Sequence, residues 1–353
     1  MAIGLSGSNG GIGPAVRCVR PDEITERFYD RIPLEISYFI NNVCNLNCAH
    51  CYVNYEKHSG GLSAEKWKGL FSELIGIGAR TFGNVGMEPL LSWRKTREIM
   101  LFLRDQKTKI PDLRFGLVTN GTLMDNEIVN EMAEISPDYI DVSIDGNEAT
   151  HDAIRGEGMF EKTMMNLETL TDSLKKKVFI SFTLNQITAP GMEAIVPQLA
   201  KLGIRHFLIS PYATVQNVQY DHLWMPAEEM AQLVSRMTEN LNVPGTSIYV
   251  KSDYDTSRDF MEALVDLGLI DLKNLSVDKY GVVFSLHEKG GQKFYFNWLG
   301  VRTTFIKDVR ISHDGFVSGC LDMFFKDYPH RAIGNVSNVS ITETLRRKSS
   351  VGK

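Results

Sequence analysis

Short apolar segments alternate with segments of helical periodicity over residues 34–210, and this alternation restricts the chain to few folds. The segments expected to be strands are 34–40, 80–85, 114–119, 139–144, 178–184 and 205–210. Helices are expected between strands, one of them starting after the N-cap residue Ser63 and others covering 94–104 and 160–175. Strands that alternate with helices form parallel βαβ units, so six such units predict an α/β protein with an incomplete barrel.

The two ends of the chain do not follow this alternation. Residues 1–32 are expected to be irregular, because their glycine-rich stretch is neither preceded by a strand nor followed by the Lys-Ser/Thr of a phosphate loop. Residues 33–240 would form the barrel, and residues 241–353 a small α+β extension. The elements expected in this extension are strands at 247–250, 281–286 and 293–298, a helix at 260–269 and a strand–turn–strand at 310–320.

The composition suits a globular protein with a sizeable core, since 43% of the 353 residues are hydrophobic and 23% are charged. A formal net charge of -5 offers no attraction to nucleic acid or to an anionic membrane. Neither a membrane span nor a secretory signal is expected, because no apolar run is long enough and the first residues lack a basic region. Clustered cysteines fit a reducing compartment, so the cytoplasm is the expected location.

Three of the five cysteines lie in one short loop after the first expected strand. Cys44, Cys48 and Cys51 have the spacing C-x3-C-x2-C. Thiolates bind iron–sulfur clusters or zinc, and three of them can hold three irons of a [4Fe–4S] cluster while the fourth iron stays open for a substrate or cofactor. The alternatives are a thiol cluster without metal and a closed zinc site with His50, although this ring between two cysteines would hardly reach the same metal.

The cysteine loop resembles the C-x3-C-x-aromatic-C signature of the radical S-adenosylmethionine (radical SAM) superfamily, with His50 in the aromatic place and Tyr52 following the last cysteine. The resemblance implies a (β/α)6 partial barrel with a [4Fe–4S] cluster and S-adenosylmethionine (SAM) as cofactors, and Tyr52 near them. In that superfamily the open iron binds the methionine part of SAM. An electron from the cluster then cleaves SAM to a 5′-deoxyadenosyl radical, which abstracts hydrogen from the substrate. An external electron donor of the flavodoxin or ferredoxin type is therefore also implied.

A second motif follows the second expected strand. Gly86-Met87-Glu88-Pro89 resembles the Gly-Gly-Glu-Pro motif of the superfamily, in which backbone and carboxylate hold the methionine ammonium of SAM. A glycine lets the backbone approach a ligand closely, and a carboxylate is a suitable partner for a cation. Met87 replaces the second glycine, which leaves the role of that amide open. Outside such a context, a Glu before Pro is usually a solvated turn residue.

Polar residues near the ends of later strands extend the predicted SAM site, because ligands of parallel α/β folds gather there. Ser143 and Asp145 are expected to point to one side of their strand and to hold ribose hydroxyls or other polar groups of SAM. Arg155 resembles an arginine that pairs with the SAM carboxylate in the peptide-modifying branch, and the alternative is a surface salt bridge. Further candidates for contact with SAM or substrate are Thr119, Asn120 and Ser210.

The C-terminal part resembles the SPASM/twitch extension of radical SAM enzymes through the Gly-x4-Cys pattern at 315–320 and the segment 333–336. In relatives this extension binds one or two auxiliary clusters, which need several more cysteines. Outside the cysteine loop the chain has only Cys18 and Cys320. The resemblance therefore implies a degenerate extension and a single cluster.

Cys320 is the candidate catalytic residue of this extension. As a hydrogen-atom donor it would quench a substrate radical from the face opposite the adenosyl group, as in radical SAM epimerases. The alternative is a small apolar core residue. Asp322 is a candidate base if the reaction is an oxidation.

The predicted reaction is epimerisation of a small metabolite, such as a sugar, an aminoglycoside or another natural-product intermediate. Dehydrogenases of this family usually pass an electron to an auxiliary cluster, which this chain cannot build. The alternatives are dehydrogenation with an external acceptor, a lyase-type rearrangement, and modification of a ribosomal peptide by epimerisation or cross-linking. Outside enzymes, the alternative is a non-catalytic iron–sulfur or zinc-binding protein.

Overall fold

The computed structural model describes residues 17–19, 34–51, 61–212, 222–251, 254–277, 283–297, 308–318 and 332–349. Its centre is a run of six parallel strands in which each strand pairs with the next along the chain. These strands are β2 (Leu34–Phe39), β3 (Ala79–Gly86), β4 (Arg114–Thr119), β5 (Tyr139–Ser143), β6 (Val178–Leu184) and β7 (His206–Pro211). Each begins and ends within one residue of the expected range, so the α/β fold with a parallel sheet is confirmed.

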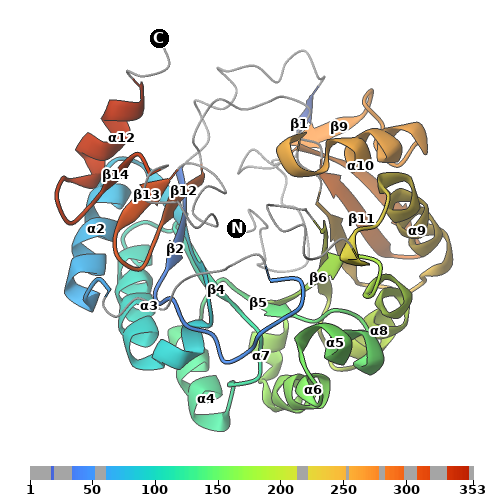
Figure 1. Cartoon of the computed structure of the whole chain (residues 1–353), viewed down its shortest axis with the longest axis horizontal. Coiled ribbons are helices and arrows are strands. Elements are labelled where there is room, and N and C mark those ends of the chain that lie inside the picture. Colours follow the sequence, from blue (N-terminus) through green and yellow to red (C-terminus); the bar gives the residue numbers. More distant parts are fainter. Residues whose placement is uncertain are drawn as a thin grey trace.

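Helices cover the outer side of this curved sheet, as Figure 1 shows. They are α2 (Ala64–Gly76), α3 (Trp93–Lys107), α4 (Asn126–Ile135), α5 (Glu148–Arg155), α6 (Met159–Thr169), α7 (Asp172–Lys175), α8 (Ala189–Lys201) and α9 (Ala227–Asn240). Alternate strand residues such as Phe82, Leu117, Ile140 and Ile180 point toward these helices and are fully buried in the main core. The residues between them face the inner, concave side of the sheet.

Two helix boundaries illustrate how local sequence acts. The Ser63 side chain accepts a hydrogen bond of 3.2 Å from the Lys66 amide, as expected of the N-cap of α2. The single helix expected over 160–175 is instead split into α6 and α7. The Thr171 hydroxyl accepts from the Leu174 amide at 3.3 Å, because a threonine that caps a new helix interrupts the preceding one.

Strands from the part after residue 240, together with one short strand at residues 17–19, lengthen the same sheet at both edges. Beyond β7 lie β8 (Ser247–Val250), β11 (Gln292–Asn297), β10 (Val283–Lys289), β9 (Leu275–Val277) and β1 (Arg17–Val19), while β12 (Asp308–Ile311), β13 (Phe316–Ser318) and β14 (Gly334–Asn335) lie beyond β2. The pairs β7–β8, β8–β11 and β2–β12 are parallel. The domain boundary at residues 240 and 241 stays a prediction, although backbone hydrogen bonds join strands from both sides of it.

The strand β1 was not expected, because residues 1–32 were predicted to be irregular. It pairs antiparallel with β9 over Arg17, Cys18 and Val19. Three residues are too few to show an alternating pattern, and the pairing uses backbone groups that any sequence supplies. Cys18 thus lies on an edge strand opposite Ser276.

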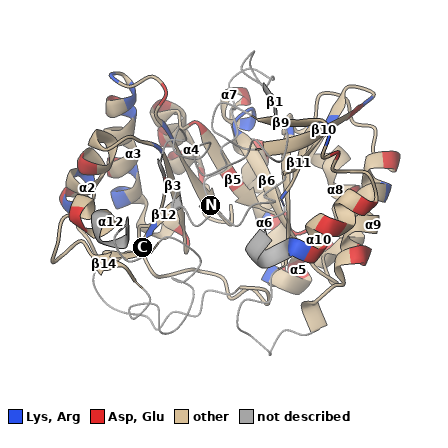
Figure 2. Ribbon diagram, turned by 90° about the horizontal axis from the view of Figure 1, so that it is seen from above, with Lys and Arg blue, Asp and Glu red and all other residues tan. Residues whose placement is uncertain are grey.

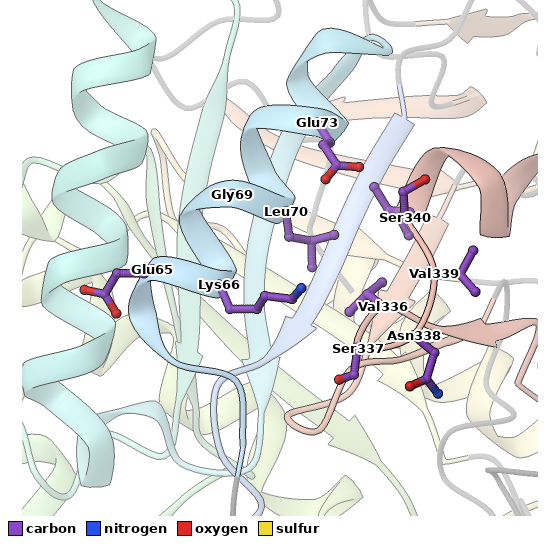
Figure 3. A pocket seen from close by; sticks show the side chains of 11 residues that line it. Glu65, Lys66, Gly69, Leu70, Glu73, Val336, Ser337, Asn338, Val339 and Ser340 are labelled. Carbon is purple, nitrogen blue, oxygen red and sulfur yellow. The ribbon is translucent and has the colours of Figure 1, made fainter.

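Helices of the C-terminal part pack against helices of the parallel core. Helix α12 (Ile341–Ser349) lies beside α2, and α10 (Tyr254–Asp266) lies beside α9 (Figure 1). A groove of about 370 Å³ separates α2 from the segment 336–341, and Figure 3 shows the side chains of both elements around it. Acidic and basic residues are spread over the outer helices (Figure 2). Among the described residues, no helix is long and apolar enough to cross a membrane.

Candidate active site

The cysteine loop follows β2 and is held by backbone hydrogen bonds to two other elements. The Ala49 amide donates to the Ile154 carbonyl in α5 at 2.8 Å, and the Glu88 amide donates to the Val43 carbonyl at 3.0 Å. Cys44, Cys48 and Cys51 form no disulfide bond in the described part of the chain, and all three are partly exposed. Tyr52, which the sequence places next to them, lies outside the described residues.

The thiols have different polar neighbours. The Sγ of Cys44 accepts from the Leu46 amide at 3.4 Å and from the Asn120 side-chain amide at 3.9 Å. The Sγ of Cys48 faces the guanidinium of Arg155, with 3.9 Å to its Nη1. Burial raises the pKa of Cys44, and it raises the pKa of Cys48 to about 11 although Arg155 acts in the opposite direction. Without a metal both groups are therefore thiols at neutral pH, and metal binding must release their protons.

Glu88 is fully buried and joins the second motif to the end of β4. Its Oε1 accepts from the Leu90 amide at 3.0 Å and the Thr119 hydroxyl at 2.8 Å, and its Oε2 accepts from the Asn120 amide at 2.8 Å. Burial raises the pKa of Glu88, and these hydrogen bonds act against that rise. The carboxylate thus has partners within the protein, and its contact with the methionine ammonium stays a prediction. The other residues of this motif are Met87, which is half-buried, and Pro89, which is buried at the start of the 3-10 helix η2 (Pro89–Ser92).

Gly86 has a reason to be glycine that the sequence did not reveal. A Cβ at this position would lie 1.6 Å from Cδ1 of Phe39 on the neighbouring strand. The close approach that we expected toward a ligand is therefore also required by the packing of β2 against β3.

Side-chain amides and a hydroxyl connect the cysteine loop to the end of β4. Asn120 donates to the Asn45 side-chain oxygen at 2.9 Å, and Asn45 donates to the Thr122 hydroxyl at 2.9 Å. The Thr122 hydroxyl donates to the Asn120 side-chain oxygen at 2.7 Å, which closes the ring of hydrogen bonds. Neither Asn45 nor Thr122 was predicted. The position of Asn45 beside the first cysteine was a signal that could have identified it.

Asp145 lies at the centre of a buried polar cluster. Its Oδ2 accepts from Nε of Arg155 at 2.7 Å and lies 3.3 Å from Nε2 of His50, and its Oδ1 accepts from the Thr183 amide at 3.0 Å. Burial acts to raise the pKa of Asp145, but Arg155 and His50 outweigh it, so the pKa lies below its usual value. These partners are groups of the protein itself, and contact of Asp145 with ribose hydroxyls or other polar groups of SAM stays a prediction. Asp145 lies beyond the end of β5, where strand alternation no longer determines the side-chain direction, and α5 brings Arg155 back to it.

Arg155 is the last residue of α5, and its side chain is only 9% exposed. The alternative of a surface salt bridge therefore does not hold, because the ion pair with Asp145 is buried. The Nε atom is used by Asp145, while Nη1 is directed to Cys48. A planar guanidinium keeps further donors in the same plane, so a carboxylate ligand such as that of SAM stays a predicted partner.

The Nε2 atom of His50 lies against Asp145. Burial lowers the pKa of His50 to about 4, so at neutral pH the contact of its Nε2 with Asp145 is a hydrogen-bonding contact rather than an ion pair. Within the described part of the chain, no three Cys, His, Asp or Glu side chains gather around one point as ligands of a single ion. A [4Fe–4S] cluster is held differently, since each thiolate binds its own iron. Three separate, partly exposed thiols on one loop fit such a cluster better than a closed zinc site with His50.

The remaining predicted residues take different places. Ser143 and Ser210 are half-buried on neighbouring parts of the sheet, where Ser143 pairs with Ser181 and Ser210 with Thr183. Thr119 is buried and bound to Glu88. Cys320 and Asp322 lie outside the described residues, so their roles stay predictions.

Three thiols follow the first barrel strand of a parallel α/β sheet, and polar groups lie at the ends of the next strands. This arrangement is typical of an enzyme site that holds a metal–sulfur cluster with a cofactor bound to it. Residues 38–196 match the family model of the Radical SAM superfamily, so this part of the chain is a radical SAM domain. Enzymes of this superfamily use a [4Fe–4S] cluster and SAM, so these are the cofactors of the site.

Curated relatives and solved structures are also similar to this chain. The chain is 28% identical over 50% of its length to the Fe-coproporphyrin III synthase of Methanosarcina barkeri, and 25% identical over 58% of its length to the sporulation killing factor maturation protein SkfB of Bacillus subtilis. It covers 43% and 49% of these proteins, so it spans about half the length of the curated relatives it matches. The fold resembles that of SuiB from Streptococcus suis, crystallised with S-adenosylmethionine, with a TM-score of 0.64, 14% identity and coverage of 89% of this chain and 66% of that chain.

Proposed function

We propose that the protein cleaves SAM reductively at a single [4Fe–4S] cluster and abstracts a hydrogen atom from a natural-product intermediate or a short peptide. One observation carries this proposal: on the loop after β2, the thiol of Cys44 lies next to Asn120 at the carboxyl end of β4, and the thiol of Cys48 lies next to Arg155 at the end of α5. Cys44, Cys48 and Cys51 would hold the cluster. When bound, the cluster supplies the electron that splits SAM into methionine and the hydrogen-abstracting 5′-deoxyadenosyl radical.

The protein's own residues would bind and orient SAM. Arg155 supplies a fixed positive charge for the methionine carboxylate, since guanidinium pairs with carboxylate through two parallel hydrogen bonds. Ser143 and Ser210 are polar, half-buried groups on the same side of the sheet that could accept the ribose and adenine. An external flavodoxin or ferredoxin would supply the electron, and a reducing cytoplasm would keep the thiols free.

The first test needs no substrate. The protein is reconstituted anaerobically, its iron and sulfide are counted, and 5′-deoxyadenosine is measured after addition of SAM and dithionite. We expect one [4Fe–4S] cluster per chain and 5′-deoxyadenosine formation that Cys48→Ala abolishes, because the loop would lose one of its three thiolates. Cys18→Ala is the matched control, since Cys18 lies on the edge strand β1. Zinc in place of iron, without SAM cleavage, would contradict the proposal.

The substrate class is inferred from the names of relatives. One of them is the PqqA peptide cyclase of Rhodopseudomonas palustris, which is 26% identical over 54% of this chain, and another is the Fe-coproporphyrin III synthase described above. These names favour a peptide or a cofactor precursor as the substrate, beside the sugar or aminoglycoside that the sequence suggested.

The proposed outcome is epimerisation with Cys320 as the hydrogen donor. The Cys320 thiol would return a hydrogen atom to the stereocentre from the face opposite to the one where bound SAM, once cleaved, would supply the abstracting group. The resulting thiyl radical would be reduced to the thiol by one electron from the external donor and one proton from solvent. The net change of the substrate is then inversion without oxidation. SAM is consumed with one electron and becomes methionine and 5′-deoxyadenosine.

Cys320→Ala tests this step. The variant is expected to keep forming 5′-deoxyadenosine while losing the inverted product, because abstraction does not need the thiol. Turnover of wild type in deuterated solvent should place one deuterium at the inverted centre, since thiol protons exchange with solvent. Inverted product from the variant would rule out the assignment, and an oxidised product with both proteins would favour dehydrogenation with Asp322 as the base.

A further inference from the structure

We propose that Asp145 is a positioning residue that holds the Arg155 guanidinium beside Cys48, so that a fixed positive charge next to the cysteine loop raises the reduction potential of the bound cluster. The inference rests on the proposed function, because it assumes that the loop binds the cluster. It gives Asp145 a task that differs from direct contact with SAM.

The ion pair between Asp145 and Arg155 is buried. Asp145 has no exposed surface and Arg155 is only 9% exposed. Removing two charges from water is costly, and the cost is offset only by good geometry and further hydrogen bonds. Both are present, because Nε of Arg155 lies 2.7 Å from Oδ2 and the Thr183 amide occupies Oδ1. Such an arrangement confines the guanidinium to one place.

The confined guanidinium lies beside the thiol of Cys48. With Nε bound to Asp145, Nη1 lies 3.9 Å from the Sγ of Cys48. The hydrogen bond of the Ala49 amide to the Ile154 carbonyl ties the next loop residue to the end of α5. The carboxylate from the end of β5, the guanidinium from the end of α5 and the thiol from the loop after β2 therefore form one unit.

His50 strengthens the link between Asp145 and the loop. Its Nε2 lies 3.3 Å from the same Oδ2 that Arg155 contacts. Since His50 lies between Cys48 and Cys51 in the sequence, Asp145 contacts the loop through this ring and reaches Cys48 through Arg155. This explains why a histidine can take the aromatic place of the signature.

The thiols of Cys44 and Cys48 differ in the charge of their polar neighbours. The Sγ of Cys44 has only uncharged donors in the described structure, the Leu46 amide and the Asn120 side chain, whereas Cys48 has a cation. A positive charge near a cluster ligand stabilises the reduced cluster, which carries one more negative charge. The reduction potential should therefore rise, and an external donor would reduce the cluster more easily.

The sign of the potential change in Asp145→Asn separates positioning from simple loss of charge. Removing a carboxylate while Arg155 stays in place would make the surroundings more positive and raise the potential. If Asp145 holds Arg155, the guanidinium moves away and the potential falls instead. We expect the reduction potential to fall by at least ~59 mV. For a one-electron couple, this fall lowers the ratio of reduced to oxidised cluster tenfold at a fixed potential.

The measurement is an electron paramagnetic resonance redox titration of the reconstituted protein without SAM. Arg155→Gln should lower the potential as Asp145→Asn does, and the double variant should add nothing, because both changes remove the same charge from Cys48. Asp145→Glu should restore part of the wild-type potential. Asp141→Asn is the matched control, since it removes a nearby buried carboxylate that accepts its hydrogen bond from Ser181 and not from Arg155.

Several outcomes would overturn the inference. A potential that rises or stays unchanged in Asp145→Asn would show that Arg155 does not depend on Asp145. If Asp145→Asn cannot hold a cluster, Arg155→Gln decides, and an unchanged potential there would end the argument. A wild-type protein that binds no iron and sulfide would instead refute the proposed function, so the two failures are distinguishable.

Discussion

Three buried carboxylates near the site differ in what surrounds them, and so their pKa values are shifted in different directions: upward for Glu88 and Asp141, and downward for Asp145. Glu88 is surrounded by uncharged donors, and Asp145 by a guanidinium and an imidazole. Asp141, on β5, is 4% exposed and accepts a hydrogen bond from the Ser181 hydroxyl. Its neighbours Ile140 and Val142 belong to the helix-facing core, so Asp141 lies on the inner face of the sheet. Sequence alone shows three acids, and only their surroundings tell them apart.

Asp141 leads to a prediction about pH. Burial raises the pKa of Asp141 from 3.8 to about 6, so the folded protein holds this proton more tightly than the unfolded chain. The ionised carboxyl therefore lowers the free energy of unfolding. This effect is absent below the pKa of the group in the unfolded chain and complete above its pKa in the folded protein. Asp141→Asn should remove this contribution and increase the free energy of unfolding at neutral pH by about 1–3 kcal/mol. The hydrogen bond with Ser181 can persist, since the Asn oxygen also accepts.

Urea unfolding of both proteins across the range from the unfolded to the folded pKa checks this prediction. The difference in unfolding free energy should grow with rising pH and then level off. Ser181→Ala provides a control, because it removes the hydroxyl and leaves the buried carboxyl in place. Parallel pH profiles of wild type and Asp141→Asn would show that Asp141 titrates normally.

At the scale of elements, the position of α5 decides where Arg155 lies. Helix α5 begins after the N-cap Asn147, whose side chain accepts from the Thr150 amide at 3.2 Å. Gly191 in α8 lets the two helices approach closely, because a Cβ there would lie 2.2 Å from the Thr150 hydroxyl and 2.7 Å from the Asn147 amide. The first turn of α5 is therefore set by a glycine of another helix.

Gly191→Ala should displace α5 and weaken the site. Overpacking of this kind costs about 1–3 kcal/mol, and the shift would move Arg155 relative to Cys48. We expect a lower free energy of unfolding and weaker SAM binding, the first measured by urea unfolding and the second by calorimetry on the reconstituted protein. Gly69→Ala in α2 is the control, because a Cβ there meets nothing within 4 Å and should stabilise the helix slightly. Unchanged SAM binding in Gly191→Ala would contradict the importance of α5.

At the scale of the whole molecule, one sheet connects the site with the C-terminal part. Strand β12 pairs with β2, which precedes the cysteine loop, and β8 pairs with β7. Both edges of the parallel core are thus covered by later strands, so they are not left open for pairing with other chains. The parts that sequence analysis separated at residues 240 and 241 share backbone hydrogen bonds.

The sequence by itself determined the six core strands, the cysteine loop and the superfamily. Each of these is a local signal: periodic burial for the strands, and the spacing of three thiols for the loop. Residues close in sequence report such features directly. The split of the helix at Thr171 and the short strand β1 were missed, because a single cap and a three-residue backbone pairing leave almost no pattern.

Only the tertiary structure decided the partners of Glu88, Asp145 and Arg155. A carboxylate or guanidinium in a sequence can face a ligand, solvent or another residue, and the type of residue does not distinguish these cases. The choice was made where the ends of β2, β4, β5 and α5 meet, by groups far apart in the chain such as Asp145 and His50, or Glu88 and Asn120. Local motifs thus identify the residues that carry the chemistry of the site, while the electrostatics of the site depend on long-range packing.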